Sequence, residues 1–291
     1  MSIKRIFVIS TGSVRIHEEH IRRSWKPLLV WLLFGQRMSG PLPINVYVIE
    51  HDKGLVLFDT GQDIRSVTDS GYFPKGIIGY LYRKLATFNI QPEQTLTTLL
   101  QSNGHRPEDI RAVVMSHLHQ DHIGGLAEIG SVPVYIAKDE LATVKQKRAV
   151  IDGVMADHIL LPNVAWKPID FTANTDESLG LFTESHDMFG DGSLVLLRTP
   201  GHTPGSISLL IREEGRAPVI CVGDLTYDVR LLEKSIVPGV GRSKQMRESV
   251  RAVLSLKQSH PNLIVAAAHD PAARGLVEEV WANQARERKR L

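Results

Sequence analysis

The stretch that decides the fold is Ser116-His117-Leu118-His119-Gln120-Asp121-His122. It follows the apolar run Ala112-Val113-Val114-Met115, which predicts a strand that ends in a loop rich in metal-binding side chains. Imidazoles suit zinc, iron and similar ions, and the carboxylate of Asp121 adds a harder ligand. Histidines this close would repel one another when protonated and would be costly to bury unpaired. The pattern HxHxDH therefore predicts a metal site rather than a solvated polar loop.

Three further ligand candidates stand later in the chain. His202 lies in Thr199-Pro200-Gly201-His202-Thr203-Pro204-Gly205, where proline and glycine on both sides make a stiff turn that can fix an imidazole. Asp224 and His269 follow the apolar stretches 219–223 and 263–268. Because the ends of several strands converge in sheet proteins, we expect these side chains to join the cluster. Together with the first four, they are enough for two metal ions with open coordination positions.

The bulk composition bounds the class of protein. With 291 residues, of which 43% are hydrophobic, the chain can bury a large core as one domain or as two intimate halves. The ligand candidates lie in both halves, roughly 1–175 and 176–291, so neither half would hold a complete site alone. Charged residues make up 23% and the net charge is +2, so no strong field points to nucleic acid as a partner.

Cysteine usage and hydropathy bear on the compartment. Cys221 is the only cysteine, so no internal disulfide can form and a reducing compartment, the cytoplasm, is expected. The N-terminus lacks the pattern of a secretory signal. The most hydrophobic stretch, 27–34, is shorter than the roughly 20 residues that cross a bilayer, so no membrane insertion is expected. That stretch still requires burial or a partner.

Strand-like and helix-like stretches alternate along the chain and predict an α/β fold. Strands are expected at 3–10, 44–50, 55–58, 112–116, 193–198, 206–211, 219–222 and 263–267. Helices are expected at 77–88, 93–101, 139–150, 243–258 and 275–288. The turn Asp191-Gly192 predicts a hairpin before the strand that begins at Ser193.

The order of these motifs resembles the metallo-β-lactamase superfamily over nearly the whole chain. The resemblance rests on Leu57-Phe58-Asp59-Thr60-Gly61, the HxHxDH cluster, His202, Asp224 and His269. It implies one domain over residues 1–291, folded as an αββα sandwich with the site at one edge of the two sheets. It also implies that Asp59 orients a ligand rather than binding metal.

The metal ligands that the resemblance implies form two groups joined by a bridging carboxylate. They are His117, His119 and His202 for one ion, Asp121, His122 and His269 for the other, and Asp224 as the bridge. The implied cofactors are two divalent ions, with zinc as the first candidate and iron, cobalt or manganese as alternatives.

One branch of the superfamily is favoured by Gly223-Asp224-Leu225-Thr226-Tyr227, which places a tyrosine three residues after the bridging aspartate. This spacing resembles the N-acyl homoserine lactonases, a quorum-quenching branch. The branch implies that a metal-bridging hydroxide opens the lactone ring, while the Tyr227 hydroxyl helps to stabilise the oxyanion. Asp224 or Asp121 would pass a proton to the leaving alkoxide. The alternative for Tyr227 is an ordinary packed tyrosine.

The apolar stretch 27–34, with Trp25 and Met38, resembles the N-terminal loop that lines an acyl pocket in this branch. A homodimer interface or plain core are the alternatives, and a pocket and an interface can coexist. The remaining histidines are expected on the surface, with His186 at most beside the site. The surface set is His17, His20, His51, His105, His158 and His260.

Other functions remain open for such a site. The nearest are a thioesterase, a carboxylic esterase and an organophosphate hydrolase, which are also binuclear metallo-hydrolases. A more distant alternative is an iron-dependent persulfide dioxygenase, which shares HxHxDH but uses a single iron. The presence of His122, Asp224 and His269 together favours two ions.

Overall fold

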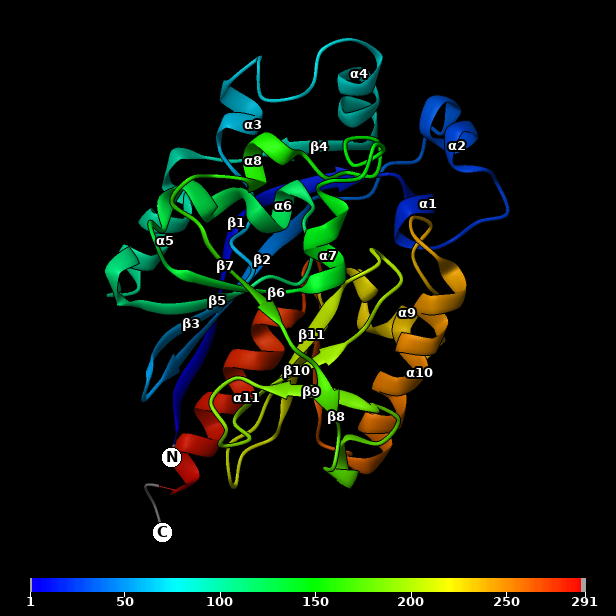
Figure 1. The fold of residues 1–291 in the computed structure, drawn as a ribbon. Helices are drawn as coiled ribbons and strands as arrows, with labels where there is room; N and C mark the ends of the chain where they lie inside the picture. Colours follow the sequence, from blue (N-terminus) through cyan, green and yellow to red (C-terminus); the bar gives the residue numbers. More distant parts are fainter. Residues whose placement is uncertain (1, 289–291) are drawn as a thin grey trace.

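Two β-sheets lie face to face, and helices cover their outer sides, in the computed structural model, which describes residues 2–288 (Figure 1). The first sheet has seven strands in the order β4-β1-β2-β3-β5-β6-β7. The second has six in the order β13-β12-β11-β10-β9-β8. This arrangement confirms the αββα sandwich predicted from the sequence.

The first sheet is antiparallel on one side and parallel on the other. Strand β1 pairs antiparallel with β2 and β4, and β2 pairs antiparallel with β3. Strands β3, β5, β6 and β7 run parallel. The strands are β1 (Ile3–Ile16), β2 (Leu42–His51), β3 (Gly54–Phe58), β4 (Ala86–Asn89), β5 (Ile110–Val114), β6 (Pro133–Ala137) and β7 (Ala165–Ile169).

The second sheet is antiparallel except for the pair β12 and β13. The hairpin predicted at Asp191-Gly192 joins β9 to β10. The strands are β8 (Thr172–Ala173), β9 (Glu184–Asp187), β10 (Leu194–Arg198), β11 (Ile207–Ile211), β12 (Val219–Cys221) and β13 (Ile264–Ala266).

The central strands are apolar on both faces because each face packs against a different layer. Along β10, Leu194 and Leu196 point into the space between the sheets, whereas Val195 and Leu197 point to the helices outside. This follows from the two-residue period of a strand. Strands buried on both sides appear in the sequence as continuous hydrophobic runs, which is why they were predictable.

Helices seal the outer faces of the sandwich. The outer face of the first sheet packs against α5 (Leu96–Ser102), α6 (Gln120–Ile123) and α8 (Ala156–Ile159). The second sheet is covered by α9 (Val229–Glu233) and α10 (Ser243–Ser259). Helix α10 buries Met246, Val250 and Val253 at the three- and four-residue spacing of an amphipathic helix. Helix α11 (Ala273–Arg288) packs against β1 and β13.

Several element boundaries differ from the sequence prediction. The helix expected at 77–88 is α4 (Gly76–Leu85), after which β4 pairs with the end of β1. Pairing and packing on β1 outweigh helix propensity there. The helix expected at 139–150 ends early, as α7 (Lys138–Thr143). The stretch 27–34 forms an unpredicted helix, α2 (Leu28–Phe34). The other short helices are α1 (Glu18–Ile21) and α3 (Arg65–Thr68).

The two sheets share one buried core, which contains Ile6 and Val56 from the first sheet and Leu209 and Val219 from the second. The assignment of residues 1–291 to one domain stays a prediction. Within residues 2–288, every helix is too short or too polar to span a lipid bilayer. The cytoplasmic location also stays a prediction, since it rests on the single cysteine.

Candidate metal centre

All seven ligand candidates meet where the strands of both sheets end. His117 and His119 lie in the loop after β5, and Asp121 and His122 lie in the first turn of α6. His202 comes from the loop between β10 and β11. Two more candidates complete the set, namely Asp224 in the 3₁₀ turn after β12 and His269 after β13. The fold thus brings together side chains up to 152 positions apart, from His117 to His269.

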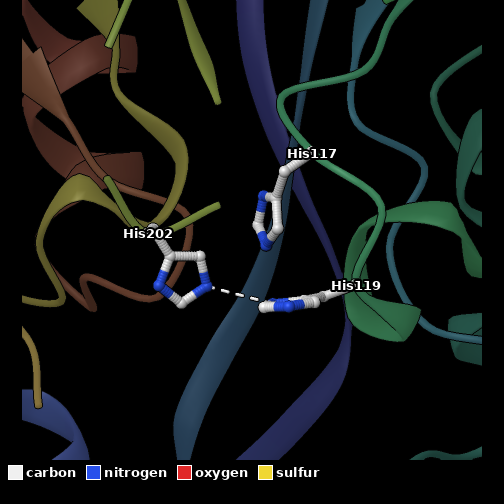
Figure 2. Close-up of side chains that lie close together, drawn as sticks. All are labelled: His117, His119 and His202. Atoms are coloured by element: carbon white, nitrogen blue, oxygen red, sulfur yellow. Dashed lines mark hydrogen bonds between the residues drawn. The ribbon is translucent and has the colours of Figure 1, made fainter. Parts of the chain in front are cut away.

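Three histidine rings form the first group (Figure 2). His119 Nδ1 lies 3.0 Å from His202 Nε2, and the His117 ring stands beside both. The His119 Nε2–H donates to the carbonyl of Asp152 at 3.1 Å, so Nδ1 carries the lone pair. The ligand atoms of the three residues lie within 4.8 Å of one another.

Asp224 connects this group to the second one. Its Oδ2 lies 3.5 Å from His202 Nε2, while its Oδ1 lies 3.2 Å from His122 Nε2 and 3.4 Å from His269 Nε2. Asp121 Oδ2 lies 3.5 Å from the same His269 nitrogen. The carboxylate of Asp224 therefore turns one oxygen to each group.

Hydrogen bonds behind the rings of His117, His122 and His269 fix which nitrogen of each faces the centre. His122 Nδ1–H donates to Asp59 Oδ2 at 2.8 Å, and His269 Nδ1–H donates to the carbonyl of Pro43 at 2.9 Å. The Ser116 hydroxyl donates its hydrogen to Asp59, so its oxygen accepts from His117 Nδ1–H at 3.0 Å. Each of these three rings consequently turns Nε2 toward the centre, which is the orientation of a metal-binding imidazole.

Asp59 is the anchor of this supporting shell. Its Oδ1 accepts the Ser116 backbone N–H at 2.7 Å, in addition to the bonds from Ser116 Oγ and His122 to Oδ2. Its backbone adopts a φ of 64°, a conformation that aspartate tolerates better than most residues. Asp59 thus contacts a ligand candidate through a hydrogen bond, in the place that the family resemblance implies.

The pKa shifts of the buried histidines and of Asp224 show which charge the centre favours. Burial lowers the pKa of His117 and His202 well below the ordinary histidine value, so both rings are neutral. Burial would also lower the pKa of His122, but Asp224 and Asp59 outweigh it and raise that pKa well above the usual value. The pKa of Asp224 lies well below its usual value because the nearby His269 and His122 outweigh its desolvation. The site stabilises positive charge beside Asp224.

The donor atoms fit a metal. Among the described residues, His117 Nε2, His122 Nε2 and Asp224 Oδ1 are buried without any hydrogen-bond partner. Buried polar atoms normally have partners, and facing lone pairs repel. A cation among them satisfies all three, and three imidazoles beside carboxylates are the donors that divalent ions such as zinc take. The cluster therefore implies divalent metal ions.

Glu140 is a part of this centre that the sequence analysis missed. This buried carboxylate on α7 accepts from the Leu118 backbone N–H at 3.0 Å through Oε1. Its Oε2 accepts from Thr203 Oγ1 at 2.7 Å and from the Gly205 N–H at 2.9 Å. A Cβ at Gly205 would stand 2.3 Å from the Glu140 backbone nitrogen, so this contact requires glycine. Glu140 joins the HxHxDH loop to the His202 loop.

We expect Glu140→Gln to lower the free energy of unfolding by about 1–3 kcal/mol, since one backbone or hydroxyl donor then faces an amide NH₂. Metal affinity should fall as well, because both ligand loops lose their common anchor. Urea denaturation and metal titration measure the two effects. Glu248→Gln, on the exposed face of α10, is the matched control. Equal stability and metal affinity in the two variants would contradict this role.

The surface prediction for the other histidines is wrong for His17, His20 and His51, which are buried. His17 and His20 pack against Trp31 of α2, so the unpredicted helix is what covers them. His51 contacts Ser193 and the Phe189 ring. The remaining three histidines predicted on the surface are partly exposed, namely His105, His158 and His260. His186 is also partly exposed and donates to the Asp170 carbonyl, outside the cluster.

Tyr227 reaches the centre and meets one of these buried histidines. Its hydroxyl donates to Asp224 Oδ2 at 2.7 Å, and it lies 3.0 Å from His20 Nε2. Burial and the neighbouring Asp224 raise the pKa of Tyr227 well above its usual value, so the hydroxyl keeps its proton. Burial lowers the pKa of His20 to about 4, against the pull of Asp224, so this ring is neutral at pH 7.

A cavity of about 810 Å³ opens onto the cluster. Its polar end is formed by residues of the centre, including His119, Asp121, Asp224 and Tyr227. Much of its wall is apolar and comes from β1, α2, α4 and β4. This apolar part comprises Val14, Ile16, Leu28, Leu29, Leu32, Ile78, Leu81, Leu85, Ala86 and Phe88, and the segments 143–154 and 240–242 line the rest. Trp25 and Phe34, expected in this wall, are instead 90% and 77% exposed and lie outside it.

Comparison with known proteins agrees with this geometry. The profile of the Metallo-beta-lactamase superfamily matches residues 39–269. The chain is 26% identical over 241 residues to an N-acyl homoserine lactonase from a Bacillus species, with 81% of each chain covered. It is 24% identical over 283 residues to the N-acyl homoserine lactonase AttM from Rhizobium radiobacter, with 96% of this chain and 95% of that one covered.

A solved structure has the same fold. It is an AiiA mutant from B. thuringiensis with N-decanoyl-L-homoserine bound at the active site, and the TM-score is 0.74 at 22% identity. The match covers 93% of this chain and 95% of that one. Both the family profile and the fold confirm the resemblance seen in the sequence, and the chain belongs to the metallo-beta-lactamase superfamily.

Proposed function

We propose that this hydrolase opens the lactone ring of N-acyl homoserine lactones. The observation that carries the proposal is the junction of an apolar cavity with the His/Asp cluster, because such a substrate joins a fatty acyl chain to a small ester ring. Two relatives of about a quarter identity are N-acyl homoserine lactonases, which supports this substrate class. Destruction of such lactones would make the protein a quorum-quenching enzyme.

We assign two divalent ions to the centre. His117, His119 and His202 would hold one, and Asp121, His122 and His269 would hold the other. Asp224 would contact both, since each of its oxygens faces one group. Zinc is the first candidate, with iron, cobalt or manganese as alternatives. When bound, such ions activate water for attack and draw charge from the substrate carbonyl.

The chain's own residues would supply the remaining steps. Tyr227 stays protonated and lines the cavity, so its hydroxyl is placed to donate to the carbonyl oxygen as negative charge develops there. Asp121 is the better placed of the two aspartates to carry a proton to the leaving ring oxygen. It lines the cavity and is partly exposed, whereas both oxygens of Asp224 face histidines or Tyr227.

A pH-indicator assay of ring opening tests the proposal. Acyl homoserine lactones, the corresponding thiolactones and a phosphotriester should be compared at equal concentration with one metal-loaded preparation. We expect the lactones to have the highest kcat/KM. A preference for the phosphotriester or for a thioester would move the assignment to an organophosphate hydrolase or a thioesterase on the same centre.

The metal content is a separate prediction. After loosely bound metal is removed, elemental analysis should find about two equivalents per chain, because the two donor groups each have three ligands besides the shared Asp224. Removal of metal with a chelator should abolish hydrolysis, and addition of zinc should restore it. Full activity with one equivalent would contradict the binuclear assignment and favour the single-iron dioxygenase.

The cavity wall predicts how acyl-chain length affects turnover. Each buried methylene contributes about 0.8 kcal/mol, or roughly a fourfold rise in kcat/KM, until the cavity is full. Leu29→Ala and Leu32→Ala, which remove parts of the wall, should flatten this rise while short-chain lactones are almost unaffected. Phe34→Ala, on the same helix but outside the wall, is the matched control. A flat profile in the unmutated enzyme would rule out the acyl role.

We also propose that the outer face of α2 is where a second copy packs, if the chain is a homodimer. Val30, Leu33 and Phe34 of this helix are exposed, as is the neighbouring Trp25. Phe34→Ala should then shift the protein toward monomer in light scattering and affect all substrates alike. An unchanged mass in this variant would count against α2 as the interface.

A further inference from the structure

His20 is a buried imidazole that the sequence analysis assigned to the surface. It contacts the Tyr227 hydroxyl and the Trp31 ring, and it borders the cavity close to the metal centre. Its Nε2 lies 3.0 Å from Tyr227 Oη, and its ring meets the Tyr227 ring edge-on at 5.4 Å between centroids. The proposed reaction gives this residue no role.

The direction of the hydrogen bond between the two residues follows from their neighbours. Tyr227 has one hydroxyl hydrogen, and it donates this hydrogen to Asp224 Oδ2, which as a carboxylate oxygen can only accept. Tyr227 Oη must therefore accept from His20, which requires the hydrogen of this neutral ring to sit on Nε2. The other ring nitrogen, Nδ1, has no hydrogen-bond partner among the described residues. Tyr227 is thus the only polar contact that the His20 side chain makes in this part of the chain.

We propose that His20 is a positioning residue for Tyr227, which it holds by donating Nε2–H to the Tyr227 hydroxyl oxygen. With one lone pair of Oη occupied, the hydroxyl hydrogen can point only into the centre. It points to Asp224 here, and it would turn to the carbonyl oxygen when a lactone is bound. This inference rests on the proposed function for the lactone, but the contact between His20 and Tyr227 does not.

The fold holds His20 firmly enough for this role. Its backbone carbonyl accepts the Gly239 N–H at 2.9 Å, which ties the short helix α1 to the segment after α9. Trp31 of α2 also packs against the imidazole, and three leucines of this helix line the cavity. An acyl chain bound against α2 would consequently contact the same helix that packs on His20. Through His20, this helix also supports the Tyr227 hydroxyl.

Two substitutions separate the hydrogen bond from the bulk of the ring. A glutamine amide can reach the place of the imidazole Nε2, whereas an asparagine amide is too short. His20→Asn should therefore lower kcat by roughly tenfold to 10²-fold through misplacement of Tyr227, with KM and metal content unchanged. His20→Gln should restore most of the loss. His17→Asn is the matched control, since His17 also packs on Trp31 but donates to the Lys84 carbonyl instead.

A double-mutant cycle decides whether His20 acts through Tyr227. In the Tyr227→Phe background, His20→Asn should change kcat little, because the group it positions is already gone. An equal loss in both backgrounds would overturn the proposal, as would a His17→Asn effect of the same size. A change confined to KM would also overturn it, since this would mean that His20 contributes equally to binding of the ground state and of the transition state.

A second readout does not depend on hydrolysis. Nitrogen NMR of the metal-loaded protein should show His20 as the Nε2–H tautomer, and Tyr227→Phe should shift its Nε2 signal and leave that of His17 unchanged. If no lactone is opened by the wild type, the proposed function fails, while this signal still tests the contact. If the Nε2 chemical shift of His20 were the same in Tyr227→Phe as in the wild type, the positioning role would be contradicted.

Discussion

His202→Ala should abolish hydrolysis, with kcat/KM reduced well beyond the roughly 10–100-fold that loss of a supporting partner around a metal costs. The residue is the only member of the three-histidine group that comes from the second sheet. Its removal leaves His119 Nδ1 and Asp224 Oδ2 without their neighbour and opens the group to solvent. Turnover and bound metal should be measured on the same preparation, and about one equivalent of metal should be lost.

The choice of control for this experiment depends on the structure. His51 is expected on the surface from the sequence, but its ring is buried against Ser193 and Phe189, so truncation would destabilise the protein for unrelated reasons. His186 is partly exposed and makes a single backbone contact. His186→Ala should keep activity and metal content. Near-wild-type turnover in His202→Ala would show that the second-sheet loop holds no essential ligand.

The ligand candidates were predictable because each carries a local signal. Apolar runs in the sequence mark the strands. A residue that directly follows such a run lies at the end of the strand, as His117 does after β5 and Asp224 after β12. Strand ends of both sheets meet at one edge, so adjacency in space followed from the fold. The same reasoning gave the fold class, since strands buried on both sides are long hydrophobic runs.

The supporting residues were not predictable for the opposite reason. Glu140 lies in an ordinary helical stretch, and only the approach of Leu118 and Gly205 in three dimensions gives it a partner. His20 stands among charged residues, and its burial depends on a helix that packs from outside its own stretch. The local sequence around a buried glutamate or histidine can be the same as that around an exposed one, so it does not predict burial.

The cavity wall was predicted in part. The stretch 27–34 contributes to the cavity as expected, but helical geometry divides it, so that Leu28, Leu29 and Leu32 line the cavity while Phe34 lies outside it. Another part of the wall comes from α4 and β4. The sequence pattern there predicted one long helix, and β4 formed instead because its partner strand β1 is longer than expected.

Tyr227→Phe should lower kcat by roughly 10- to 10³-fold, the range expected for loss of one donor to a developing oxyanion. The substitution keeps the ring, which packs with Val14, Ile16 and Ile44, and removes only the hydroxyl. Metal content should not change, because the hydroxyl contacts Asp224 without replacing any of its histidine neighbours. Steady-state kinetics across several acyl lactones measures the effect.

The pattern of the loss identifies the cause. A fall in kcat and kcat/KM by the same factor means that the hydroxyl acts only in the transition state, whereas a rise in KM alone means that it binds the ground-state carbonyl or amide. Tyr82→Phe is a useful comparison, because Tyr82 also borders the cavity but its hydroxyl donates to the Val150 carbonyl rather than to Asp224. If both variants behaved like the wild type, Tyr227 would be a packing residue, and the lactonase assignment would lose its most specific support. The seven ligand candidates fit every hydrolase proposed for this centre, so removal of the Tyr227 hydroxyl is the more specific test of the lactonase assignment.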